Sequence, residues 1–170
     1  MLAQSLIQTP LGPMLLVHGD GALQLAEFHD NPTKAARYPG ADTASPAPAW
    51  LADAFAAYFS GNLHALHSLP TRVSGSDFDK RVWAELRNIP PGQTRSYGDI
   101  ARALGGVATG KGGLARAVGL ASGRNPLAIV TPCHRVIGAD GSLTGYAGGL
   151  AAKRWLLQHE GWRPAQEKLL

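Results

Sequence analysis

The only cysteine of the chain lies in a segment that contains several chemically reactive side chains. In the stretch NPLAIVTPCHRVIGADGSLTGY, Cys133 is preceded by Pro132 and followed by His134 and Arg135. Positive charge beside a thiol favours the thiolate, which is the nucleophilic form of cysteine. Most free cysteines are instead small buried hydrophobic residues. The local pattern therefore favours a reactive thiol and leaves an inert one as the alternative.

Sequence neighbours do not automatically form a pair of nucleophile and base. In a strand adjacent side chains point to opposite faces, and in a helix positions i and i+1 do not face each other. His134 would need a turn or a bridging water to reach the sulfur of Cys133, and a third group to orient its ring. Glu160 is a candidate, because an anion at the end of a helix is disfavoured by the helix dipole and needs another partner. A solvated surface glutamate is the alternative.

Composition indicates a folded protein without a membrane span. The chain has 170 residues, of which 45% are apolar and 16% charged, so it can form one ample domain or two small ones. A single cysteine cannot form an internal disulfide, which favours a reducing compartment. The N-terminus has no signal-peptide pattern, and no apolar run approaches the about 20 residues of a membrane span. We expect a soluble, cytoplasmic protein.

Charge is distributed unevenly between the two halves of the chain. Residues 1–75 contain three Lys or Arg against five Asp or Glu, a net charge of −2, whereas residues 76–170 contain thirteen against seven, a net charge of +6. A basic half beside an acidic one indicates that the basic half binds a polyanion. Basic surfaces also occur on proteins with no specific partner, so charge alone leaves this open.

Residues 1–75 are expected to form a small domain with a sheet and a helix. Two apolar stretches flank the turn HGDG at 18–21, which predicts a β-hairpin. Residues 31–50 are rich in Pro, Ala and Gly and indicate an irregular connection. Helical spacing of apolar residues predicts a helix over 49–61, and residues 62–76 look like an extended segment leading into a linker.

A second, mainly helical domain is expected over residues 76–170. Its predicted elements are a helix over 76–89 with Ser76 as N-cap, short helices over 96–106 and 114–123, a buried strand over 126–132 and a closing helix over 148–161. Two short helices joined by a Gly-rich turn, on the basic half of the chain, fit a helix-turn-helix. An αα-hairpin packed in a core is the alternative.

The segment PCHRVIGADGSLTGYAGGLAAKRWLLQHEG resembles the active-site block of the O6-alkylguanine-DNA alkyltransferases, also called methylated-DNA–protein-cysteine methyltransferases. Upstream, FDKRVWAELRNIPPGQTRSYGDIARALG, ARAVGLA and NPLAIVTPCHRV match the family's DNA-binding domain in order, and TPLGPMLLV resembles the start of its N-terminal domain. The resemblance implies an α+β fold. A supporting α/β domain over 1–75, ribonuclease-H-like with a short antiparallel sheet plus helices, would precede a winged-helix-like domain with a helix-turn-helix over 76–170.

The resemblance also assigns catalytic roles. Cys133 would accept the alkyl group, and His134, oriented by Glu160, would take the thiol proton through a water. Tyr97 would donate a hydrogen bond to the guanine leaving group, and Asn125 would brace the turn before the active site. The ordinary alternatives are an aromatic residue that packs at a helix start for Tyr97 and a simple Asn-Pro turn for Asn125.

DNA-binding and pocket residues follow from the same resemblance. Arg116 would enter the base stack in place of an extruded nucleotide, although a lone helix arginine is more often a solvated charge. The other expected DNA-binding residues are Ser96, Tyr97, Ala115, Ala117, Gly119 and Arg135. The wall of the guanine pocket is expected to contain Val136, Tyr146, Ala147 and Gly148. Small residues on the second short helix suit close approach to the minor groove, where sequence readout is degenerate.

The expected partner is double-stranded DNA containing O6-alkylguanine, and possibly O4-alkylthymine, with no cofactor, no membrane and no obligate protein partner; we expect a monomer. Some family members bind zinc in the N-terminal domain, but only the weak pair His64 and His67 is available here, so we expect no metal. The turn at 105–113 is longer and richer in Gly than expected, which leaves a phosphate contact of Lys111 open. A damage sensor without transfer activity and a cysteine hydrolase are the competing functions.

Overall fold

The computed structural model describes residues 2–28, 46–107 and 113–164. The chain divides into two compact units: unit 1 is Met1–Ser74 with Pro126–Val130, and unit 2 is Gly75–Asn125 with Thr131–Leu170. A segment from the second half of the chain therefore belongs to unit 1, which no sequence pattern indicated. No helix in the described ranges is long and apolar enough to cross a membrane.

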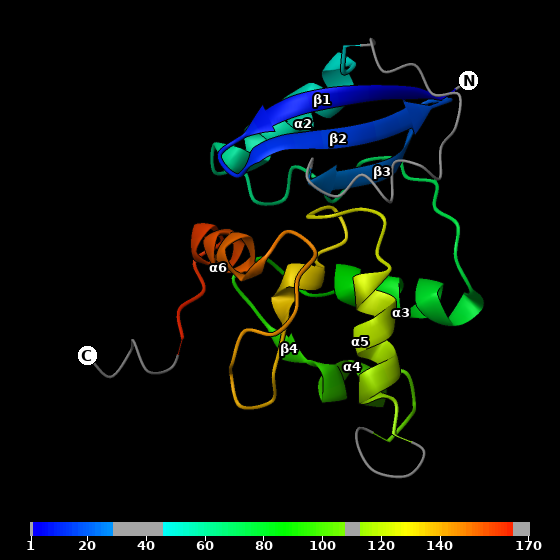
Figure 1. Cartoon of the computed structure of the whole chain (residues 1–170), viewed down its shortest axis with the longest axis vertical. Coiled ribbons are helices and arrows are strands. Elements are labelled where there is room, and N and C mark those ends of the chain that lie inside the picture. The colour runs from blue at the N-terminus through cyan, green and yellow to red at the C-terminus, as the bar shows by residue number, and fades with distance from the viewer. Residues whose placement is uncertain (1, 29–45, 108–112, 165–170) are drawn as a thin grey trace. The chain divides into compact units, whose positions relative to one another are not determined.

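The sheet of unit 1 is an antiparallel meander of three strands (Figure 1), β1 (Ala3–Thr9), β2 (Gly12–Gly19) and β3 (Ala22–Phe28), in the order β1-β2-β3. Asp20 and Gly21 join β2 to β3 with φ values of 53° and 74°. Two consecutive residues with positive φ make the tight turn that matches the twist of a hairpin. The predicted hairpin is therefore confirmed, and β1 extends it by one strand.

Helix α2 (Ala49–Phe59) supplies much of the remaining core of unit 1. Leu51, Phe55 and Tyr58 follow one another at i, i+4 and i+7 and are fully buried, which confirms the predicted helix. The extended segment predicted over 62–76 is only partly correct. Backbone hydrogen bonds form turns over 63–68, and only after them does Thr71 pair with Leu23 in a parallel bridge. The predicted irregular connection lies mostly outside the described residues.

The strand predicted over 126–132 is wrong. These residues are buried, but Leu127 makes only an isolated bridge with Ala26, and residues 128–130 form a turn. Ile129 has a φ of 71°, which no β-strand allows. An apolar run indicates burial but not backbone geometry, which is why the sequence pattern misled.

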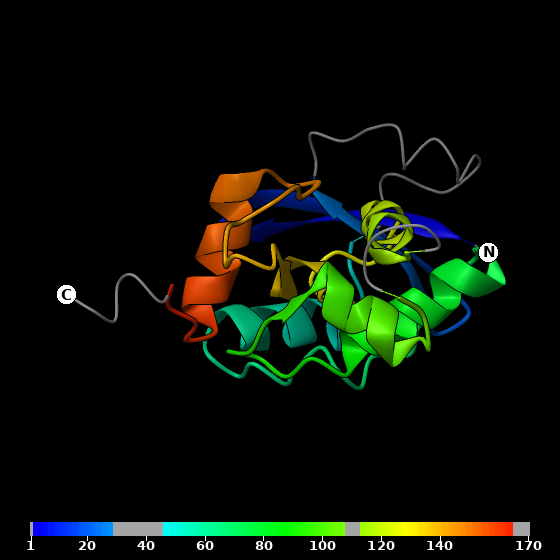
Figure 2. The same cartoon turned by 90° about the horizontal axis from the view of Figure 1, so that it is seen from below.

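Unit 2 contains the four helices predicted for the second half of the chain. Its elements are α3 (Asp77–Arg87), β4 (Arg95–Ser96), α4 (Tyr97–Ala103), α5 (Ala115–Gly123), the 3-10 helix η1 (Cys133–Arg135), β5 (Val136–Ile137) and α6 (Leu150–His159). In both views the segment formed by η1 and β5, coloured yellow, lies between α6 and the group of α3, α4 and α5 (Figures 1 and 2). Lys111 lies outside the described residues.

Helix α5 is fixed to α3 by polar contacts near its C-terminal end. Trp83 Nε1 donates to the carbonyl oxygen of Ala121 at 2.9 Å, and Arg124 donates twice to Asp79, at 2.7 and 2.8 Å. The hydrogen bonds from Arg124 lower the pKa of the Asp79 carboxyl. At the start of α3, Ser76 caps the helix by accepting from the Asp79 amide, as predicted. These contacts hold α5 at a defined place on α3.

A glycine allows the turn after α3 to meet the end of α6. Gly92 has a φ of +83°, and a Cβ atom there would lie 2.9 Å from the carbonyl oxygen of Glu160, the C-cap residue of α6. Both the backbone angle and the close approach exclude a larger residue without rearrangement. The turn thus closes on the residue that sequence analysis singled out on the last helix.

We expect Gly92→Ala to lower the free energy of unfolding by about 1–3 kcal/mol from backbone strain, with a further loss from the clash with Glu160. Gly141→Ala is the matched control, because Gly141 has a similar φ of +86° but no atom within 4 Å of an added Cβ. Urea unfolding of both variants measures the difference. Equal losses would show that the close approach to Glu160 contributes nothing.

Candidate active site

A short parallel pair of strands brings the start of α4 beside the cysteine segment. Arg95 pairs with Val136 and Ser96 with Ile137, so residues about 40 positions apart in sequence are hydrogen-bonded neighbours. The Ser96 side chain accepts from the Asp99 amide, and the Asp99 side chain accepts from the Ser96 amide. This capping box starts α4 at the next residue, Tyr97.

The cysteine lies on a 3-10 turn and not in a strand. Cys133 is partly exposed, whereas His134 beside it is fully buried. The amide of Cys133 donates to the carbonyl oxygen of Thr131 at 2.8 Å, and Asn125 Nδ2 donates to the same oxygen at 2.8 Å. Asn125 thus holds the carbonyl oxygen of the residue two positions before Cys133, and its role as a brace of the active site stays a prediction.

His134 has the hydrogen-bond pattern of a positioned base. Its Nε2 lies 2.9 Å from Glu160 Oε2, and because an ionised carboxylate only accepts, we assign the proton to Nε2. The other ring nitrogen, Nδ1, is buried and has no hydrogen-bond partner among the described residues. Burial lowers the pKa of His134 despite the opposing attraction of Glu160, which favours a neutral ring with an available lone pair on Nδ1.

Glu160 is a buried carboxylate held by two cationic or polar neighbours. Arg135 Nε donates to Oε1 and Nη2 to Oε2, both at 2.8 Å, in addition to the contact from His134. Burial alone would raise the pKa of Glu160, but the contacts with His134 and the hydrogen bonds from Arg135 outweigh it, and the pKa lies well below its usual range. The alternative of a solvated surface glutamate is therefore wrong.

Arg135 was expected to bind DNA, and the structure corrects this expectation. Its side chain is only 8% exposed, and its third nitrogen, Nη1, donates to the carbonyl oxygen of Ile89 at 2.6 Å. Each of its three nitrogens already donates one hydrogen bond inside the protein, and a guanidinium this deeply buried is not presented to a phosphate. Arg135 instead balances the charge of Glu160 and fixes its orientation.

Lys153 is a site residue that sequence reasoning missed. It is fully buried on α6, and its Nζ donates to the carbonyl oxygens of Val136 and Thr144, both at 2.6 Å. Burial lowers the pKa of Lys153 from 10.5 to about 8, and an electrostatic interaction with Cys133 acts in the opposite direction. The helical spacing of Lys153 with Leu156 and Glu160 could have indicated it, because this spacing places the lysine on the buried face of α6.

Tyr97 is connected to the same group of residues. Its side chain is half-buried, and its hydroxyl lies 3.0 Å from Thr144 Oγ1. Since Lys153 binds the carbonyl oxygen of Thr144, the loop before α6 is held on both sides. Tyr146, farther along this loop, packs edge-on against the His134 ring, with centroids 6.3 Å apart.

The remaining residues of the predicted pocket and DNA surface stay predictions. Val136 is fully buried, Ala147 is exposed, and Gly148 is half-buried. On α5, Arg116 is exposed, while Ala115, Ala117 and Gly119 are half-buried. A Cβ at Gly119 would lie 3.7 Å from the Tyr97 ring, which places this part of α5 against the start of α4.

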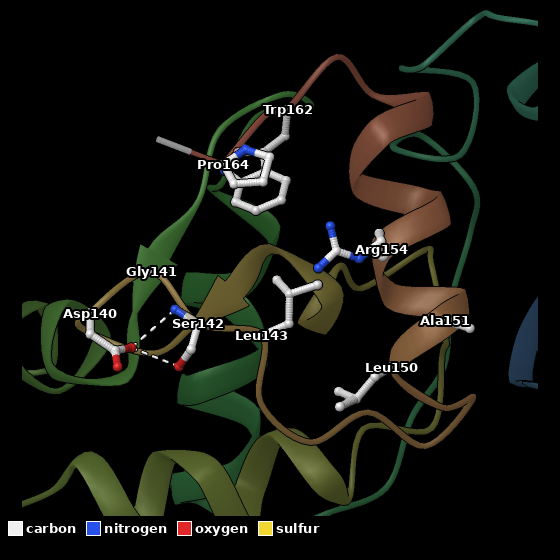
Figure 3. Close-up of a pocket in the computed structure, with 9 residues that line it drawn as sticks. All are labelled: Asp140, Gly141, Ser142, Leu143, Leu150, Ala151, Arg154, Trp162 and Pro164. Carbon is white, nitrogen blue, oxygen red and sulfur yellow. Dashed lines mark hydrogen bonds between the residues drawn. The ribbon is translucent and has the colours of Figure 1, made fainter. Parts of the chain in front are cut away.

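A cavity of about 730 Å³ in unit 2 lies apart from these residues (Figure 3). It is lined by Asp140, Gly141, Ser142, Leu143, Leu150, Ala151, Arg154, Trp162 and Pro164. Ser142 donates to Asp140 at one edge, and Leu143, Leu150 and Arg154 project into the space. None of the predicted site residues lines it. Among the described residues, no group of three or more His, Cys, Asp or Glu could hold a metal ion.

We expect Glu160→Gln to lower the free energy of unfolding by about 3–5 kcal/mol at pH 7, because it leaves the buried Arg135 without a counter-charge. Since the pKa of Glu160 is lower in the folded state than its ordinary 4.5, its contribution is complete above pH 4.5. The difference between wild type and variant should therefore shrink as the pH falls below 4.5. Urea unfolding from pH 7 to pH 3 measures this.

Glu85→Gln is the control for this titration, because Glu85 makes only a 4.0 Å ion pair with Arg95 nearer the surface. Its effect should be small at every pH. A loss for Glu160→Gln that does not change with pH would contradict the assignment of a buried, charged carboxylate.

Comparison with known proteins identifies the family. Residues 77–162 match the family model "6-O-methylguanine DNA methyltransferase, DNA binding domain". The methylated-DNA–protein-cysteine methyltransferase of Salmonella typhimurium is 43% identical over 170 residues, covering 95% of this chain and 96% of the relative. The crystal structure of the Mycobacterium tuberculosis O6-methylguanine methyltransferase matches with a TM-score of 0.80 and 40% identity over 99% of both chains.

A second solved structure, that of Mycobacterium tuberculosis OGT in complex with DNA, matches with a TM-score of 0.80 and 40% identity over 93% of this chain and 92% of that one. The matches extend over nearly the whole chain and include the cysteine turn, its buried glutamate and the helices around them. The chain belongs to the methylated-DNA–protein-cysteine methyltransferase family, whose members repair alkylated DNA by alkyl transfer.

Proposed function

We propose that this chain removes the alkyl group from O6-alkylguanine in DNA by transferring it irreversibly to Cys133. The observation that carries the proposal is the buried pair of Glu160 and His134, in which His134 directly follows a partly exposed cysteine and its Nδ1 has no hydrogen-bond partner among the described residues. Such a pair can accept a proton from the thiol and stabilise the resulting imidazolium.

The substrate base must leave the duplex before the sulfur can reach it. An alkyl carbon on guanine O6 is inaccessible inside the base stack, so the nucleotide is flipped into the protein. An alkylated guanine pairs poorly, which lowers the cost of a few kcal/mol for unstacking. Arg116, exposed on α5, fills the vacated position in the stack.

Transfer then occurs in one displacement. The thiol proton of Cys133 moves through a water to His134 Nδ1, and the thiolate attacks the alkyl carbon. The S–C bond forms as the C–O6 bond breaks, and the electron pair passes to the guanine, whose negative charge is stabilised by the Tyr97 hydroxyl. The product thioether has no activated carbonyl for water to attack, so each molecule reacts once.

Two further residues position this chemistry. Lys153 interacts electrostatically with Cys133 and holds the carbonyl oxygen of Thr144, which steadies the loop expected to wall the guanine. Arg135 keeps Glu160 ionised and oriented toward His134. Both act through neighbouring groups and not on the substrate.

The division of labour between the two parts of the chain follows from where these residues lie. Residues 76–170 contain every residue to which a chemical or DNA-binding role is given. Residues 1–75 act as a support and take no part in the chemistry. The protein functions as a monomer in the cytoplasm, on double-stranded DNA, without a metal or cofactor.

Incubation with a duplex carrying one O6-methylguanine is expected to add one methyl group to the peptide that contains Cys133, in a 1:1 ratio with protein. Cys133→Ala should bind the duplex and gain no mass. Intact and peptide mass spectrometry measure both. Binding by the wild type without a mass gain would indicate a damage sensor, and turnover of esters or amides would indicate a hydrolase.

Tyr97→Phe is expected to slow transfer by about 10²-fold while duplex affinity changes little, because the lost hydroxyl acts on charge that develops in the transition state. Thr144→Val is the control: it keeps the Tyr97 hydroxyl and removes only its partner. Single-turnover rates and binding isotherms separate the two effects. A Tyr97→Phe variant that reacts at the wild-type rate would exclude the proposed role.

A further inference from the structure

The exposed face of α5 carries a large cationic and a large apolar side chain, although most of the other residues of this helix are small. The exposed residues within the helix are Arg116, Leu120 and Gly123, at i, i+4 and i+7, so they form one stripe. The opposite face holds the buried Val118 and Ala121. Leu120 is 57% exposed and is therefore not a core residue of unit 2.

Exposure alone does not make a leucine functional, because single exposed apolar residues are common on protein surfaces. The position of Leu120 is what distinguishes it. It lies one helical turn, about 6 Å, from Arg116 on the same face. The residues flanking it on the helix, Ala117 and Gly119, are small and half-buried, so that Leu120 and Arg116 extend beyond the backbone of a thin helix.

The two arginines near the stripe also differ in whether their charge is balanced by an acidic residue. Arg124, just beyond the helix, donates both its hydrogen bonds to Asp79, so its charge is largely balanced within the protein. No ion pair of Arg116 is recorded within the described ranges. The stripe thus has an unbalanced cation in its first turn and an apolar side chain in its middle.

Leu120 also lies beside the polar contacts that fix α5 to α3. The next residue, Ala121, receives the hydrogen bond from Trp83, and Arg124 is fixed to Asp79 less than two turns away. A side chain that is to act as a wedge needs such a support, because a mobile backbone would yield to the stacked bases.

We propose that Leu120 is an apolar wedge that enters the minor groove beside Arg116 and packs against deoxyribose and base edges next to the extruded nucleotide. The groove walls are formed by sugar carbon atoms, and proteins that bind the minor groove often insert leucine or similar residues between base steps. Leu120 is then a positioning residue for the transfer reaction. This inference rests on the proposed base-flipping repair function.

The test compares Leu120→Ala with Leu120→Met and with a matched control, Leu150→Ala. Leu150 is 49% exposed on α6, in the same unit but outside α5. Two substrates are used: a duplex with one O6-methylguanine, and the free O6-methylguanine nucleoside, which has no groove. Rates of methyl transfer and duplex affinities at several salt concentrations are measured for each variant.

Leu120→Ala is expected to lose about tenfold in duplex affinity and in transfer rate from the duplex, which corresponds to about 1.4 kcal/mol. Its rate with the nucleoside and its salt dependence should match the wild type, because the wedge touches neither the reacting atoms nor a phosphate. Leu120→Met should retain most of the duplex activity, and Leu150→Ala all of it.

A Leu120→Ala variant with wild-type rate and affinity on the duplex would overturn the proposal. So would an equal loss on the duplex and the nucleoside, which would indicate a structural defect of the pocket. Failure of the proposed function has a different signature, since the wild type would then transfer no methyl group from either substrate.

Discussion

The buried carboxylate of Glu160 is the constraint on which the rest of the active-site region depends. A charge removed from water requires an opposite charge and hydrogen-bond donors. Arg135 supplies the charge, and Arg135 and the His134 ring donate hydrogen bonds at 2.8–2.9 Å. The arrangement places the end of α6, the cysteine turn and the turn at Gly92 within contact of one another. The same contacts stabilise the fold and orient the imidazole, so folding and chemistry cannot be separated here.

Around Glu160, side chains hold the irregular segments in place by donating hydrogen bonds to their backbone carbonyl oxygens. Asn125 holds Thr131 before the cysteine turn, and Lys153 holds both Val136 and Thr144 after it. Bonds of this kind keep buried carbonyl groups satisfied where the chain has no regular secondary structure. They allow Cys133, the proposed nucleophile, to lie on an irregular segment and still have defined neighbours.

Structural features set by neighbouring residues could be predicted from the sequence, whereas features set by distant residues could not. Helices in unit 2 were correctly predicted because caps and apolar spacing are local. The strand over 126–132 was wrong, because a buried apolar run does not specify φ at Ile129. Arg135 was assigned to DNA and lies in the core, and Lys153 was overlooked, because a charged residue is expected at the surface until its partners are known.

The sequence by itself determined the family, through a resemblance that extends across the chain, and it indicated the proposed nucleophile, the one cysteine, in a PCHRV motif. It also determined the basic charge of the second half. These depend only on residue type and order. Tertiary structure alone decided that His134 presents Nε2 to Glu160, with no partner for Nδ1 in the described part of the chain, and that Lys153 is buried against two backbone carbonyl oxygens. The physical reason is that pKa values and proton positions depend on burial and on neighbours distant in sequence, which no local pattern specifies.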